Sequence, residues 1–68
     1  MLNNEDEIKV EAVFEPAKME RFVKRDALLH FVVEDLIKRG HSRNKALEAV
    51  FNGYVLDDSV MIHEYEKG

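Results

Sequence analysis

The fold is decided by residues 26–42, DALLHFVVEDLIKRGHS, in which an almost unbroken apolar run leads into a basic turn. On a helix drawn through this run, one stripe of side chains faces inward: Phe22, Leu29, Val33 and Leu36. Leu28 and Phe31 point well away from that stripe. Because a helix that is apolar on two sides must be covered on two sides, we expect a sheet or a second subunit to cover Leu28 and Phe31.

Capping signals set the ends of two predicted helices. A basic last turn followed by glycine is typical of a helix end, which gives a long helix over residues 17–39. Asp26 is an alternative N-cap that would divide this segment into a short helix and a longer one. Ser42 is an N-cap for a second helix over residues 43–52, which Gly53 ends.

Two further segments are predicted to be strands. Apolar residues take alternate positions over residues 8–14, which is the period of a half-buried strand. Residues 57–66 contain Val, Ile and Tyr, which favours a strand that pairs with the first. The predicted fold is therefore a small α+β domain with an N-terminal strand, a long helix, a second helix and a short C-terminal strand. In the alternative, Asp57 or Asp58 caps a third helix, and the first strand pairs with its copy in a dimer.

Composition predicts one small domain over residues 1–68 that works without a cofactor. A chain this short buries a modest share of its surface, and self-association as a homodimer is a common compensation. The absence of cysteine excludes disulfides, thiolate chemistry and Cys-ligated metals, and the histidines form no local ligand pair, so no metal is predicted. No apolar run is long enough to cross a membrane. The polar, acidic start, of which residues 1–6 are expected to be disordered, differs from a signal peptide, so we expect a cytoplasmic protein.

Charge is distributed in blocks along the chain. Residues 1–20 and 46–68 each carry a net charge of −4, whereas residues 21–45 carry +4. The positive block includes a basic turn without acids, whose side chains are candidate contacts for phosphate or for an acidic protein patch: Lys38, Arg39, His41, Arg43 and Lys45. Helix capping by the same residues is the alternative explanation. A second basic stripe starts the long helix and is either a solvated face or an extension of this positive surface: Lys18, Arg21, Lys24 and Arg25.

Residues 8–52, interpreted as strand, helix, glycine turn and helix, resemble ribbon–helix–helix DNA-binding proteins in the order of their elements. The resemblance implies a dimer that pairs its two strands and holds phosphate at the N-terminus of the second helix. Two features depart from that pattern. The stretch over residues 16–40 is far longer than the family's first helix, and the outward face of the strand is acidic on balance, where attraction to phosphate is needed. The turn at Gly40 also resembles ubiquitin-associated domains, but His41 stands where that family has an apolar residue, so ubiquitin binding is not inferred.

The remaining features favour binding over catalysis. Asp26 and His30 lie at helical spacing, but no nucleophile stands near them in the sequence, so no catalytic residue is predicted. We expect a non-enzymatic protein-binding regulatory or accessory module, of the kind encoded as short proteins in bacteria and phages. Its candidate interface combines surplus apolar helix surface with tyrosines: Leu28, Phe31, Tyr54 and Tyr65. The alternative is a dimeric ribbon–helix–helix-like DNA-binding regulator or antitoxin that uses the basic turn on phosphate.

Overall fold

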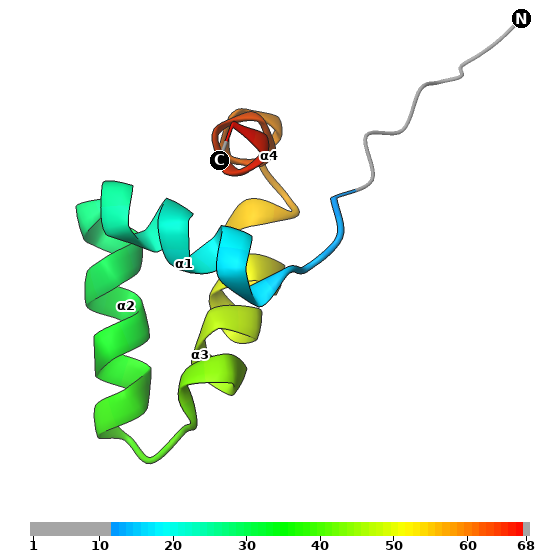
Figure 1. Ribbon diagram of the computed structural model, residues 1–68. Helices are drawn as coiled ribbons and strands as arrows, with labels where there is room; N and C mark the ends of the chain where they lie inside the picture. Colours follow the sequence, from blue (N-terminus) through cyan, green and yellow to red (C-terminus); the bar gives the residue numbers. More distant parts are fainter. Residues whose placement is uncertain (1–11, 68) are drawn as a thin grey trace, which may run out of the picture.

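The computed structural model describes residues 12–67, and all regular structure in that range is helical (Figure 1). Four α-helices follow one another along this part of the chain, with a π-helical turn, η1, between the last two. Their bounds are α1 Pro16–Arg25, α2 Ala27–Lys38, α3 Arg43–Val50, η1 Phe51–Val55 and α4 Ser59–Glu66. Figure 1 shows α2 and α3 side by side, α1 across one end of that pair, and α4 packed against α1 and η1.

The predicted α+β fold is wrong, because no strand occurs within residues 12–67. The predicted C-terminal strand is the helix α4. Asp58 precedes it with an extended backbone, and its carboxylate accepts the N–H groups of Val60 and Met61 at 2.9 and 3.3 Å. Such an N-cap stabilises a helix by about 0.5–2 kcal/mol. The alternative that ended in a third helix capped by Asp57 or Asp58 was therefore correct for the tail.

The predicted N-terminal strand has no strand partner in the described chain. Its residues 8–11 lie outside the described residues, as do residues 1–6, and residues 12–14 form no ladder. The hydroxyl of Tyr65 bonds to this segment where a neighbouring strand was expected. The α+β fold therefore loses its first strand over residues 12–14.

The long helix predicted over residues 17–39 is divided at Asp26. This residue has an extended backbone, φ −122° and ψ 109°, and its carboxylate accepts the N–H of Leu29 at 3.0 Å. α1 therefore ends at Arg25 and α2 begins at Ala27, as the alternative with an N-cap at Asp26 predicted. The break lets the chain change direction, so that α1 crosses the α2–α3 pair (Figure 1).

The turn between α2 and α3 confirms the predicted capping residues. Gly40 has φ 105°, in the left-handed region that favours glycine. The N–H of His41 donates back to the carbonyl of Leu36, which completes a Schellman helix ending. Ser42 then caps α3 by accepting the N–H of Lys45 at 3.2 Å.

The predicted end of the second helix at Gly53 is wrong. α3 ends at Val50, and the chain continues as η1 with Gly53 inside it. The N–H of Leu56 donates to the carbonyl of Phe51, which is the five-residue spacing of a π-helix. Phe51 and Val55 are both buried in this turn. Their packing outweighs the cost of glycine in a helix, which is about 1 kcal/mol relative to alanine.

Every helix contributes to one hydrophobic core. Aromatic rings meet at its centre, where the ring of Tyr65 lies 5.1 Å from that of Phe51 and 6.2 Å from that of Phe22, measured between centroids. Edge-tilted pairs of this kind are favourable beyond the area they bury. The other buried residues come from α1, α2, α3 and η1: Met19, Val23, Leu29, Val33, Ala46, Leu47, Val50 and Val55.

Candidate interaction surface

α2 carries two apolar side chains on the side that faces away from the core. Leu29 and Val33 are fully buried, whereas Leu28 is 60% exposed and Phe31 is 67% exposed. The exposed pair is separated by three positions, so the two side chains are neighbours on one helix face. We name Leu28 and Phe31 the α2 outer pair. A sheet, one of the two predicted covers, does not occur within residues 12–67.

Arg43 of the basic turn is held by carboxylates from two other helices. Its guanidinium donates to Glu20 of α1 at 2.6 and 2.9 Å and to Glu34 of α2 at 3.2 Å. These bonds raise the pKa of Arg43 above its ordinary value, with Glu20 the larger cause. The hydrogen bond from Arg43 in turn lowers the pKa of the Glu20 carboxyl. The cluster joins α1, α2 and α3. Its two carboxylates bind Arg43, which was predicted to contact phosphate or an acidic partner.

The rest of the basic turn is exposed at one end of the α2–α3 pair. Arg39 donates to Asp35 at 2.8 Å, so a second of the four Lys and Arg side chains of the basic turn also has a carboxylate partner. The hydroxyl of Ser42 accepts one of the N–H groups that a phosphate at the start of α3 would use. The structure thus brings the five predicted residues together, but two of them, Arg39 and Arg43, are bonded to carboxylates. Three of them remain exposed without a hydrogen bond from their side chains to the carboxylates described above: Lys38, His41 and Lys45.

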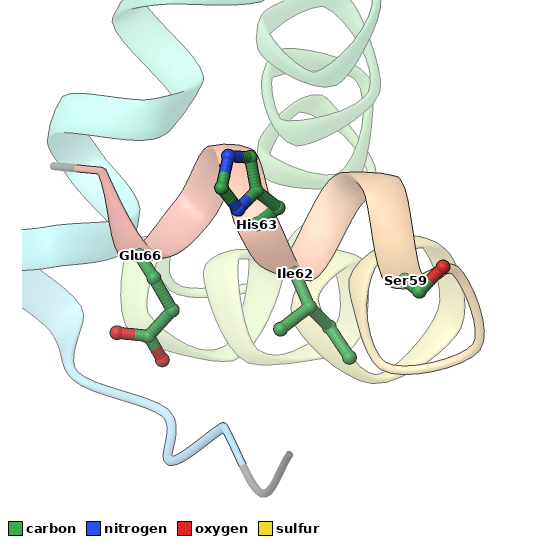
Figure 2. Close-up of a pocket in the computed structure, with 4 residues that line it drawn as sticks. All are labelled: Ser59, Ile62, His63 and Glu66. Atoms are coloured by element: carbon green, nitrogen blue, oxygen red, sulfur yellow. The ribbon is translucent and has the colours of Figure 1, made fainter.

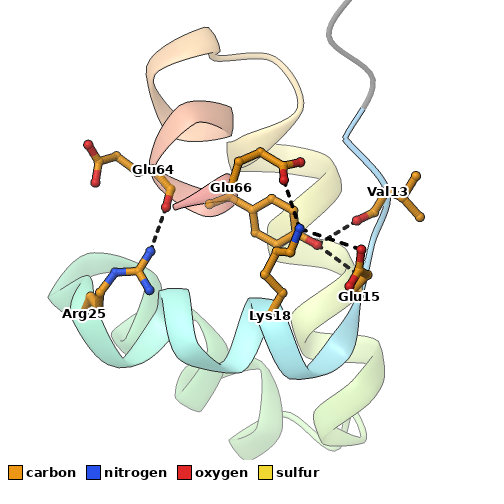
Figure 3. A network of polar contacts seen from close by, with 7 residues as sticks. Val13, Glu15, Lys18, Arg25, Glu64 and Glu66 are labelled. Carbon is orange, nitrogen blue, oxygen red and sulfur yellow. Dashed lines mark hydrogen bonds and ion pairs between the residues drawn. The ribbon is translucent and has the colours of Figure 1, made fainter. Parts of the chain in front are cut away.

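The two tyrosines that were predicted to lie at an interface have different environments. Tyr65 is fully buried, and its hydroxyl accepts the N–H of Glu15 at 2.9 Å and donates to the carbonyl of Val13 at 2.6 Å (Figure 3). Burial raises the pKa of Tyr65. The residue ties the segment before α1 to α4 and leaves no surface for a partner, which corrects its assignment to an interface. Tyr54 is 44% exposed and stays a candidate.

The second basic stripe, on α1, holds α4 in place. Lys18 donates to Glu66 at 2.9 Å, which raises the pKa of Lys18, and its ammonium lies 5.1 Å from the centre of the Tyr65 ring. Arg25 donates at 2.7 Å to the carbonyl of Glu64, one of the free carbonyls in the last turn of α4 (Figure 3). Two cations of the stripe, which was expected to be a solvated face or an extension of the positive surface, therefore bond to α4 through exposed contacts.

α4 carries a shallow depression of about 230 Å³ that the sequence did not reveal. Four residues of one helix face line it (Figure 2): Ser59, Ile62, His63 and Glu66. Their spacing is that of an α-helix, but the tail was predicted as a strand, which would divide these residues between two faces. Its walls are mostly apolar, and they include two ionisable side chains, Glu66, which is bonded to Lys18, and the exposed His63.

Three further features concern residues 12–67: metal ligands, the Asp26–His30 pair and membrane-spanning helices. No group of three or more His, Asp or Glu side chains there is placed to hold a metal ion. Asp26, which was considered with His30 as an acid–base pair, caps α2 with its carboxylate. None of the helices described is both long and apolar enough to cross a membrane.

Comparison with known proteins found no match to this chain among protein-family models, curated proteins or solved structures. The candidate surface therefore rests on the residues of this chain alone.

Proposed function

We propose that this chain is a non-enzymatic protein-binding module with a regulatory or accessory role, and that it contacts its partner through the α2 outer pair. The observation that carries the proposal is the exposure of Leu28 and Phe31, at 60% and 67%, on a helix whose other side forms the core. Two large neighbouring apolar side chains outside the core are typical of a protein-binding site. Phe is also among the residue types that are enriched at protein interfaces.

The free energy gained by burying Leu28 and Phe31 suits a contact of modest affinity. Fully burying a Leu or Phe side chain contributes about 1.5–3 kcal/mol. Burying the exposed parts of Leu28 and Phe31 would therefore contribute roughly 2–4 kcal/mol. Because association also costs translational and side-chain entropy, contacts around the pair must supply the rest.

A DNA-binding regulator, the alternative function, has less support. Arg43 is bound to Glu20 and Glu34, and Arg39 is bound to Asp35, so a phosphate would compete with carboxylates for two of the four fixed cations of the basic turn. Residues 12–14, the described end of the strand that would pair in a ribbon–helix–helix dimer, form no ladder within the chain. Phosphate binding would fall on the exposed remainder of the turn: Lys38, His41 and Lys45.

The proposal is tested by capturing partners from a cell lysate with the tagged full chain. Three forms are compared at equal loading, with and without nuclease: wild type, the double variant Leu28→Asp with Phe31→Asp, and Val60→Asp. Val60 is 66% exposed on α4, so its replacement is a matched control for adding an acid at an exposed apolar position. All three forms should show the same helical circular dichroism, since the altered side chains lie outside the core.

The proposal expects a protein that wild type and Val60→Asp retain after nuclease and that the double variant loses. A different pattern would support the DNA-binding alternative: nucleic acid is retained, binding weakens steeply with salt, and Lys38→Ala with Lys45→Ala abolishes it. Equal capture by wild type and the double variant would refute the assignment of the α2 outer pair.

A further inference from the structure

We draw no further inference here: the strongest candidate, the exposed apolar face of α2 formed by Leu28 and Phe31, carries nothing beyond the proposed function, because nothing in the structure shows what covers it.

Discussion

Replacing Tyr65 with Phe removes one oxygen atom from the point where three parts of the chain meet. The hydroxyl accepts the N–H of Glu15 at 2.9 Å and donates to the carbonyl of Val13 at 2.6 Å, while the ring packs in the core. Each intramolecular hydrogen bond contributes about 0.5–1.5 kcal/mol net. The two bonds together predict a loss of about 1–3 kcal/mol in the free energy of unfolding. A domain of this size then loses about 4–8 °C in Tm for each kcal/mol.

The measurement is urea and thermal unfolding of the full chain, followed by far-ultraviolet circular dichroism. Tyr54→Phe is the matched control, because it removes the same atom from a side chain that is 44% exposed. It should change the stability by no more than about 0.5 kcal/mol. If Tyr65→Phe is as stable as Tyr54→Phe, the bonds to Val13 and Glu15 do not hold the segment before α1, and the reasoning is refuted.

Three further predictions concern the turns and the titrating groups. Gly40→Ala should destabilise the chain by about 1–2 kcal/mol, because a Cβ is strained at φ 105°. Gly53 also faces open space but lies inside a helical turn, so Gly53→Ala should be neutral or stabilising by up to about 1 kcal/mol. Equal losses of stability in urea unfolding of the two variants would contradict the backbone conformation assigned to Gly40. The bond to Arg43 lowers the pKa of Glu20, so its contribution to the free energy of unfolding is present above the ordinary pKa of 4.5 and is lost as the pH falls through the lowered pKa. Glu20→Gln should therefore flatten that part of the acid unfolding curve. Burial raises the pKa of Tyr65, so its contribution to the free energy of unfolding is present below the ordinary pKa of 10.0 and is lost as the pH rises through the raised pKa. Tyr65→Phe should therefore lose less stability in alkali than wild type does. For Glu20 and Tyr65 alike, parallel curves of stability against pH for the variant and wild type would contradict the predicted titration.

The sequence was most informative where the deciding interaction is local. Gly40 and Ser42 were predicted correctly because a left-handed residue and an N-cap act within one turn of a helix. Asp26 was left as an alternative because its carboxylate acts only if the backbone there is extended. The C-terminal strand was wrong because Asp58 caps the tail as a helix. Alternating apolar residues over 8–14 favour a strand only if another strand lies beside them, and no strand lies beside residues 12–14 in the described part of the chain.

The residues of the candidate surface show the same difference between local interactions, which the sequence predicts, and non-local ones. Leu28 and Phe31 could be placed on the outward side of α2 from helical period alone, and their exposure confirms that placement. The fate of Arg43 could not be predicted, because Glu20 lies 23 positions away in the chain. Tyr65 was assigned to an interface from its residue type, whereas its partners are 50 and 52 positions away.

Site-specific photo-crosslinking is the most direct test of the claim that the α2 outer pair binds protein. A benzophenone amino acid replaces Phe31, Val60 or Lys45 in otherwise identical full-length chains, which are irradiated in a cell lysate. The account predicts a covalent protein adduct at position 31, to a second copy or to another protein, and little or none at position 60. An adduct to nucleic acid at position 45, with no protein adduct at position 31, would contradict it.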